Sequence, residues 1–511
     1  MTSDVTLTPM TERDYDKLCA SCDELLVTSD VTIERMAIAW LHVLNEHPSN
    51  LAKYSNFSAG LPAKPGVALK SALIQLWQWA GGRATAGAAP DAASPVDVLF
   101  VSHLLNEAQV GAAEDFYFGN APEALAKQGA SACVVLNNNT KLAAAGLDAR
   151  WPAQMARRIV LPHALSLRRE FSLRRKMAAE ARRLGASGGV EHSEFDKKVR
   201  TEARRQTRAI SSLSTLRFFH QILDLVTLLR PKAIVVTFEG HAWERMAFAA
   251  ARQVVPGVVC VGYHHTIIFP RQHAALRPLG RRFDPDVILT AGTISEKCFR
   301  EAYASRPVTV ATMGIHRRQK EASVRDPMAN VACLVIPDGI ITETVFLFDF
   351  ALDAARQAPE ISFVLRLHPI VSRPSLVQRY PRFGALPPNV SFSSVGINED
   401  FQRAQCVLYR GSNASIYAVI AGLRPFYVAR EREMPIDCLH QMQSWKKVVH
   451  TAAEFVAIAR EDRAQDDLAR GREAAEAVAF CQSYFMPVSL DVLFDTLSPA
   501  LPKRARTRAN E

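Results

Sequence analysis

Short apolar runs alternate with longer segments of helical spacing from about residue 96 to residue 430, and no other feature constrains the fold so strongly. Each run has five to seven residues and is rich in Val, Ile, Leu and Phe, which is typical of strands buried on both faces. Strands that alternate with helices predict a parallel sheet with helices on both of its faces. The sequence therefore predicts an α/β protein.

The expected strands fall into two sets, separated by the charged stretch 315–330, which has the composition of a linker. The first set comprises 96–102, 131–137, 232–238, 257–263, 285–291 and 308–314, and the second comprises 331–337, 361–367, 390–394, 406–410 and 424–430. In open α/β sheets, ligands bind beyond the carboxyl ends of the strands. Two sets of strands therefore predict two Rossmann-like domains, each with its own binding edge.

The remaining segments complete the expected domain organisation. We expect an N-terminal helical extension at 1–90, a first Rossmann-like domain at 91–320 with a helical insertion at about 147–230, a second Rossmann-like domain at 330–450, and C-terminal helices with a basic tail at 451–511. Residues 81–95 are rich in Gly, Ala and Pro, which predicts a further linker.

The net charge of +10 is concentrated in one segment, 157–208, which holds 15 Lys and Arg residues and six acidic residues. Apolar residues recur between its arginine pairs: Leu165, Leu167, Phe171, Leu173 and Met177. Two interpretations stay open, a solvated helical hairpin and a helix that docks on an anionic membrane surface or a lipid-linked glycan. Nucleic acid is the least favoured partner, because no recognition motif accompanies the charge.

The sequence has no apolar stretch of the roughly 20 residues that a transmembrane helix needs, and residues 1–17 lack the apolar core of a secretion signal. Its nine cysteines are scattered, and Cys19 and Cys22 form a lone pair without nearby histidines. We therefore expect a cytoplasmic protein with reduced thiols and no metal site. If the basic segment docks, the protein is peripheral on the inner face of the membrane.

The stretch "FVLRLHPI" (363–370) ends an expected strand in a histidine and a proline. Pro369 stops the strand and restricts the residue before it, so His368 is held stiffly beyond the strand end. An imidazole in that position can donate a hydrogen bond to a phosphate oxygen. The alternative is that the two residues only terminate the strand.

A second strand end, "YRGSNASIYAVIAG", carries Ser412, Asn413 and Ser415 around the start of the next expected helix. One N-cap requires one such residue, so three of them favour an anion site built from hydroxyls and backbone N–H groups. A third turn, "IPDGIITET", contains Gly339, which permits a close approach between the backbone and a ligand.

Two of these motifs, "LRLHP" and "RGSNAS", resemble the paired motifs of bacterial GT-B sialyltransferases, polysialyltransferases and Kdo transferases. The segment "FEGHAWERMAF" (238–248) is similar to a helix start in surface-carbohydrate biosynthesis proteins. The resemblance implies an α/β GT-B fold of two facing Rossmann-like domains. It also implies an inverting, metal-independent glycosyltransferase without a cofactor, which uses a CMP-activated nonulosonate or Kdo to build a surface glycan or glycoconjugate.

The resemblance assigns the nucleotide sugar to the second domain, where a histidine and serines hold its phosphate. Arginines there would meet the sugar carboxylate, a role that suits a planar guanidinium. The implied donor-binding residues are Gly339, Arg366, His368, Pro369, Arg410, Ser412, Asn413 and Ser415. The acceptor, a glycan, a lipid-linked precursor or a protein, would bind the domain at 91–320.

An inverting transferase needs a group that takes the proton of the acceptor hydroxyl. Glu239 is the first candidate, because it ends an expected strand just before a glycine and a helix. The alternative for Glu239 is a structural carboxylate paired with His241 or Arg245.

Asp115 is the second candidate base, in the long loop after the first strand, where Tyr117 and Phe118 would offer a stacking face to a sugar. His103 is a third candidate. His265, or the histidine before it, ends another expected strand and would contact the acceptor.

Three rival functions stay open. A CDP-glycerol-type polyol-phosphate transferase and a UDP-sugar transferase share this layout, and a non-catalytic scaffold for glycan assembly would keep the binding edges but not the base.

Overall fold

The computed structural model describes residues 10–44, 51, 54, 94–153, 155–186, 193–316, 332–464 and 467–501. The chain divides into two compact units: unit 1 consists of residues 1–266, 272–316 and 487–511, and unit 2 of residues 267–271 and 317–486. The expected linkers at 81–95 and 315–330, most of the extension beyond residue 44, and the basic tail fall largely outside the described residues.

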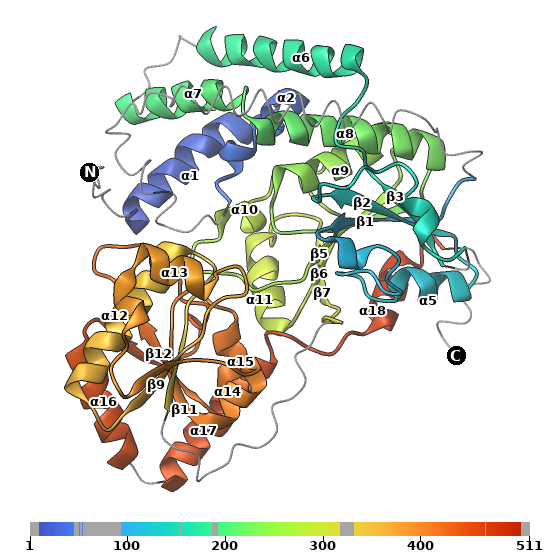
Figure 1. Cartoon of the computed structure of the whole chain (residues 1–511). Helices are drawn as coiled ribbons and strands as arrows, with labels where there is room; N and C mark the ends of the chain where they lie inside the picture. The colour runs from blue at the N-terminus through green and yellow to red at the C-terminus, as the bar shows by residue number, and fades with distance from the viewer. Residues whose placement is uncertain are drawn as a thin grey trace. The chain divides into compact units, whose positions relative to one another are not determined.

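Unit 1 contains a seven-stranded parallel sheet in the order β3-β2-β1-β4-β5-β6-β7 (Figure 1). Its strands are β1 (Val98–Leu104), β2 (Ala132–Asn138), β3 (Arg157–Val160), β4 (Ala233–Thr237), β5 (Val259–His264), β6 (Val287–Thr290) and β7 (Thr309–Thr312). Every residue of the central strand β4 is buried, in keeping with the continuous apolar run that predicted it.

The helices of unit 1 belong to the sheet or to the N-terminal extension and the insertion. Those of the sheet are α5 (Ala121–Lys127), α9 (Ala242–Val254), α10 (His273–Leu276), α11 (Thr293–Ala302) and α18 (Leu490–Leu497), with the short η3 (Glu107–Gln109) and η4 (Asp148–Arg150). Those of the extension and insertion are α1 (Glu12–Leu26), α2 (Ile33–Met36), η1 (Ala39–His42), α6 (Leu167–Ala186), α7 (Glu194–Gln206) and α8 (Ile210–Leu229). Asp23 of α1 forms ion pairs with His273 and Arg277, which joins the extension to the rest of unit 1.

The insertion at 147–230 is not purely helical as expected, because it contains the edge strand β3. In β3, Arg158 and Val160 are buried whereas Arg157 is exposed. Arg158 is neutralised by Glu123 at 2.7 Å, so a charged residue fills an inward position of the strand. A four-residue edge strand with two arginines lacks the apolar run that marks the other strands, which is why the sequence did not predict it.

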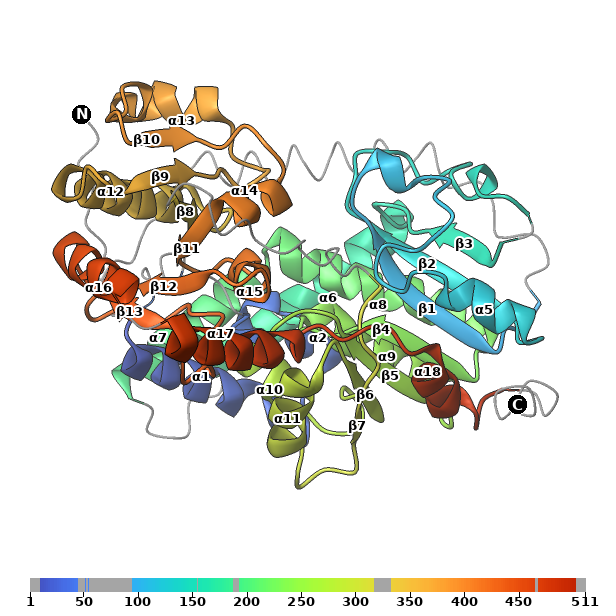
Figure 2. The ribbon, with the colours of Figure 1, turned by 90° about the horizontal axis from the view of Figure 1, so that it is seen from below.

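Unit 2 contains a six-stranded parallel sheet in the order β10-β9-β8-β11-β12-β13. Its strands are β8 (Ala332–Ile336), β9 (Ser362–Leu365), β10 (Val390–Phe392), β11 (Ala404–Tyr409), β12 (Arg424–Val428) and β13 (Lys447–Val449). Its helices are α12 (Ile341–Gln357), α13 (Arg373–Arg379), η5 (Pro381–Gly384), α14 (Ile397–Arg403), α15 (Ala414–Ile420), α16 (Ala452–Ala464) and α17 (Asp467–Gln482). Figure 2 shows α12 and α16 on one face of this sheet and α15 and α17 on the other.

The prediction of two parallel α/β Rossmann-like domains is confirmed, since each unit has its own parallel sheet and its own core. Among the described residues, no helix combines the length and the hydropathy that crossing a membrane requires.

Candidate functional site

Both sheets reverse the direction of their strand connections at one point, and polar side chains gather at both points. In unit 1 the reversal lies between β1 and β4, and in unit 2 it lies between β8 and β11. At such a point the loops of neighbouring strands leave toward opposite faces and make room for a ligand. Each unit therefore has one candidate site.

In unit 1, five rings gather beyond the carboxyl ends of β1, β4 and β5: His103, Tyr117, His241, Trp243 and His265. The ring centroids of Tyr117 and His265 are 4.4 Å apart, those of His103 and Trp243 4.7 Å, and those of His241 and Trp243 6.2 Å. Burial, aided by the charge of His241, lowers the pKa of His103 to about 4, and burial also lowers the pKa of His265. This ring cluster therefore offers neutral aromatic edges to a ligand, with His241 as the exception.

Glu239 follows β4, and its carboxylate Oε2 lies 3.6 Å from Nε2 of His241. The two side chains are 33% and 36% exposed, so a substrate can reach both. Burial opposes the charge of Glu239, but the contact with His241 outweighs it and lowers the pKa of Glu239 to about 2. Burial likewise opposes the charge of His241, but Glu239 outweighs it, so the pKa of His241 is raised. We call these two residues the Glu239–His241 pair.

The turn that carries this pair is held by Glu244, which is fully buried in the first turn of α9. The Glu244 carboxylate accepts hydrogen bonds from the backbone N–H groups of Glu239, Gly240 and His241, each at 2.8 Å. These three hydrogen bonds fix the backbone of the turn. They also give a partner to N–H groups at the start of α9 that would otherwise be unpaired. These contacts account for the residues of the motif "FEGHAWE". Its last glutamate holds the turn, and its tryptophan, Trp243, supplies the ring that contacts His103.

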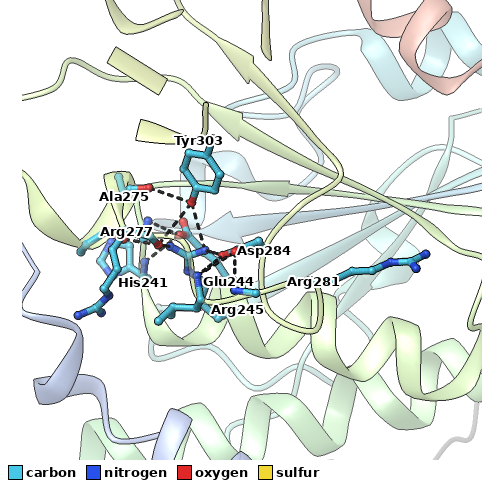
Figure 3. A network of polar contacts seen from close by, with 12 residues as sticks. His241, Glu244, Arg245, Ala275, Arg277, Arg281, Asp284 and Tyr303 are labelled. Atoms are coloured by element: carbon cyan, nitrogen blue, oxygen red, sulfur yellow. Dashed lines mark hydrogen bonds and ion pairs between the residues drawn. The ribbon is translucent and has the colours of Figure 1, made fainter. Parts of the chain in front are cut away.

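Arg245, the next residue of α9, is also fully buried and ties this turn to the following loop (Figure 3). Its guanidinium donates to the backbone carbonyls of Ala274 and Arg277, both at 3.0 Å, and pairs with Asp284. The Tyr303 hydroxyl donates to the same stretch of loop (Figure 3). A buried arginine whose charge is neutralised and whose two terminal nitrogens are hydrogen-bonded is costly to disturb, so it serves as a rigid base for the Glu239–His241 pair.

We expect Gly240→Ala to destabilise unit 1 strongly. Gly240 has φ +87°, and a Cβ at this position would overlap the backbone of Ala274. A left-handed backbone and an overfilled site together predict a loss of about 2–5 kcal/mol in the free energy of unfolding. Urea denaturation measures this loss, with Gly257→Ala as the control, because a Cβ on Gly257 meets nothing within 4 Å. Equal stability of the two variants would contradict the tight turn.

The second candidate base, Asp115, is buried and is engaged within its own loop. Its Oδ1 atom accepts three hydrogen bonds of 2.9 Å, from the Ser102 hydroxyl and from the backbone N–H groups of Tyr117 and Phe118. These bonds hold the loop together and tie it to β1, so the geometry favours a structural role for Asp115. Its catalytic role stays a prediction.

The expectation that Phe118 stacks on a sugar is corrected by its burial. Its side chain is 1% exposed and packs in the core against Phe100, with ring centroids 5.1 Å apart. His264 is likewise fully buried, with Nδ1 bonded to the carbonyl of Phe238 at 2.8 Å. Tyr117 and His265 are the acceptor candidates that the structure brings together.

A cavity of about 330 Å³ adjoins the ring cluster, beyond the ends of β2 and β3 and beside α8. Its lining includes Asn139, which donates to Nδ1 of His103 at 3.0 Å, and the rings of Trp243 and Phe218. Amides, hydroxyls and His163 form much of the remaining wall. Polar groups that alternate with aromatic faces suit a carbohydrate better than an apolar ligand.

In unit 2, the turns after β8, β9 and β11 converge at the reversal point. A Cβ on Gly339 would lie 3.2 Å from Nδ1 of His368, and a Cβ on Gly411 would lie 3.0 Å from Oδ2 of Asp338. Gly411 has φ +65°, which also disfavours other residues. The glycines of neighbouring turns therefore let His368 and Asp338 approach the backbone. His368 lies three residues past the end of β9, and Pro369 beside it is exposed.

The two titratable groups of this site, Asp338 and His368, are both shifted toward their neutral forms. Burial, aided by the charge of Glu343, raises the pKa of Asp338 to about 7, and burial lowers the pKa of His368. A protonated carboxyl and a neutral imidazole can both donate hydrogen bonds to an anion.

The serines of the motif "RGSNAS" have different environments. Ser415 is fully buried, and its hydroxyl donates to the carbonyl of Ser412 at 2.9 Å and contacts the thiol of Cys438. Ser412 is 8% exposed and stands directly after Gly411. Ser415 therefore shapes the turn, and Ser412 and Asn413 remain as donor-binding candidates.

The expectation that Arg410 meets a sugar carboxylate is corrected. Its side chain is 1% exposed, and its guanidinium donates to Glu343 at 2.7 Å, to Glu433 at 2.6 Å and to the Val428 carbonyl at 2.7 Å. Two carboxylates and a carbonyl engage all three of its nitrogens. Arg366 is more open, with 23% of its side chain exposed, and the bonds that Nη1 makes run to Ser393, Val395 and Asp400.

The sequence had named His241 only as a structural partner of Glu239, a pairing that the structure forms, and had assigned no role to Trp243 or Asp338. All three stand in motifs that it had singled out, two beside Glu239 and one before Gly339. Within the described residues, no three His, Cys, Asp or Glu side chains come together as metal ligands would.

The fold and the two sites define a two-domain α/β protein of Rossmann-like architecture. Similar solved structures include the glycotransferase of kitacinnamycin (14% identity, 80% of this chain and 100% of that chain, TM-score 0.45). They also include MurG of Acinetobacter baumannii (11%, 79% and 100%, TM-score 0.42) and UDP-GlcNAc 2-epimerase of Neisseria meningitidis bound to UDP-GlcNAc (12%, 79% and 100%, TM-score 0.40). At these identities the similarity is one of fold. No protein-family model and no curated protein matches the sequence.

Proposed function

We propose that this protein is an inverting glycosyltransferase that uses a CMP-activated nonulosonate or Kdo as its donor. The observation that carries the proposal is the convergence of His368, Asp338, Gly339 and Gly411 at the reversal point of unit 2. A nucleotide phosphate could approach the backbone closely at the two glycines. It could accept hydrogen bonds from His368 and, when the carboxyl is protonated, from Asp338, and Ser412 adds a hydroxyl.

The acceptor is assigned to unit 1. The cavity of about 330 Å³ suits a hydroxyl-rich glycan, and the Glu239–His241 pair adjoins the ring cluster that borders this cavity. The pair supplies a reachable proton acceptor, which the transfer requires.

In the proposed reaction the acceptor hydroxyl oxygen forms a bond to the anomeric carbon of the sugar, and the bond from that carbon to the CMP phosphate oxygen breaks. The hydroxyl proton passes to His241, and Glu239 stabilises the imidazolium that results. The bonding electrons leave with CMP, whose phosphate gains charge and is stabilised by donors from His368 and the neighbouring turns. The mechanism as proposed uses no metal ion and no cofactor.

The donor assignment is tested by thermal unfolding in the presence of CMP, CDP, UDP or GDP. We expect CMP and CDP to raise the midpoint, because a ligand at 100 times its Kd adds about 2.7 kcal/mol to the stability of the folded protein. His368→Ala should weaken this stabilisation, whereas His450→Ala, which alters an exposed histidine of unit 2, should retain it.

The other outcomes separate the rivals. Stabilisation by UDP or GDP but not by cytidine nucleotides overturns the CMP donor and favours another nucleotide sugar. Stabilisation by CDP alone favours a polyol-phosphate transferase. If CMP binds but is never released from a CMP-sugar with any acceptor tried, the protein is a binding scaffold and not an enzyme.

A further inference from the structure

The helix α6 has an inner and an outer face of different character. Leu173, Met177 and Leu184 are each 2–4% exposed and pack inward. Leu167 and Phe171, one turn apart, are 54% and 66% exposed. The apolar residues of this segment therefore do not share one face, and two large ones project outward. In unit 1, α6 is the outermost helix of the layer that it forms with α7 and α8 (Figure 1).

The outer face of α6 is basic around these two side chains. Arg168, Arg175 and Arg182 are exposed, and Arg175 and Arg182 stand four and eleven residues after Phe171, which keeps them on its side of the helix. An apolar pair surrounded by arginines is the pattern of a helix that lies in a membrane interface.

The two acidic residues of α6 are both turned away from this face. Glu170 binds Arg217 of α8 through bonds of 2.5 and 3.0 Å, and Glu180 is fully buried against Arg35 at 2.6 Å. Because the acids are neutralised inside the unit, they do not offset the arginines outside.

We propose that the outer face of α6 docks on an anionic phospholipid bilayer, with Leu167 and Phe171 inserted and the arginines at the headgroups. Exposed phenylalanine and leucine gain by leaving water, and arginine at the headgroups is attracted to anionic lipid. Nucleic acid would use the arginines but would leave the two apolar side chains in water.

The cavity of unit 1 lies next to the start of α6. Pro162 and His163 line the cavity a few residues before α6 begins, and Arg217 links the cavity wall to Glu170 in the first turn of α6. Docking would bring the cavity close to the bilayer, which fits an acceptor glycan attached to a lipid. This identification of the acceptor rests on the proposed function, whereas the docking itself does not.

The test is co-sedimentation of the full chain with phosphatidylcholine vesicles, with and without phosphatidylglycerol. The wild-type protein should bind only the anionic vesicles, and less tightly at high salt because the attraction is screened. Phe171→Gln should weaken binding by about ten-fold or more, since an inserted aromatic side chain is lost. The control is Val448→Gln, which removes another apolar side chain that is 48% exposed.

Charge is tested separately. The triple variant Arg168→Gln, Arg175→Gln, Arg182→Gln should lose binding at low salt. Its control, Arg356→Gln, Arg403→Gln, Arg460→Gln, removes the same charge from exposed positions of unit 2 and should bind as the wild type does.

Three results would overturn the docking proposal: no binding of wild-type protein to anionic vesicles at low salt, equal binding by Phe171→Gln and wild type, or equal effects of the two triple variants. Binding of single-stranded RNA that survives Phe171→Gln, without vesicle binding, would assign the surface to nucleic acid. Nucleotide stabilisation is measured without vesicles, so a failure of the donor assignment is distinguished from a failure of docking.

Discussion

Replacing His241 with alanine should lower kcat by about 10²–10⁴-fold, the usual contribution of a general base. The imidazole lies 3.6 Å from Glu239 and is 36% exposed, so its loss removes a reachable proton acceptor without emptying the core. Unfolding by urea should show nearly wild-type stability. His220→Ala is the control, because it removes a half-buried histidine of α8 that the mechanism does not use.

The pH dependence of kcat identifies the group that titrates. Neutral imidazole is the active form, and contact with Glu239 raises the pKa of His241 above 6.5. The rate should therefore fall as the pH decreases through a value above 6.5. Glu239→Gln removes the stabilising charge, so the fall should move to lower pH, and the maximal rate should also drop. An unchanged acid limb in Glu239→Gln, or a wild-type rate in His241→Ala, would contradict the assignment.

The second large effect is expected for His368→Ala, which should reduce kcat by about 10²-fold or more, on the scale of other preorganised donors to a developing negative charge. The protein should fold normally, because His368 is only half-buried and stands outside the strand. Steady-state kinetics with a CMP-sugar measures the loss.

Ser412→Ala is the comparison for this second prediction. It removes a hydroxyl and leaves the backbone N–H groups of the turn, so its effect should be smaller than that of His368→Ala. A wild-type rate in His368→Ala would reduce the histidine and proline to a strand terminator, which is the alternative that the sequence left open.

Much of the fold could be predicted because most strands are buried on both faces. Runs such as "AIVVT" in β4 and "SFVL" in β9 are apolar enough to be recognised without any neighbour. The edge strands β3 and β13 were missed, because each is three or four residues long and includes charged residues. An edge strand has fewer buried positions, so its composition is closer to that of a loop.

The sequence predicted where the candidate sites lie but not which side chains belong to them. A strand, a glycine and a helix start identify the residues that follow a strand, which is how Glu239 and Gly339 were found, and the proline that stops a strand identified His368. The same rule cannot say which way a side chain turns. Arg410 and Phe118 stand at strand ends or in the adjoining loop, yet both are buried, one against two carboxylates and the other against Phe100.

The sequence by itself determined the two parallel sheets, the turns that carry the sites and the excess of positive charge at 157–208, because periodicity and composition are local properties of the chain. The tertiary structure alone decided which groups meet. Arg245 meets Asp284, Asp338 stands against Gly411, and Phe171 points away from the core although Leu173 points into it. Such outcomes depend on residues far apart in the sequence, and packing and desolvation act only after the elements have come together.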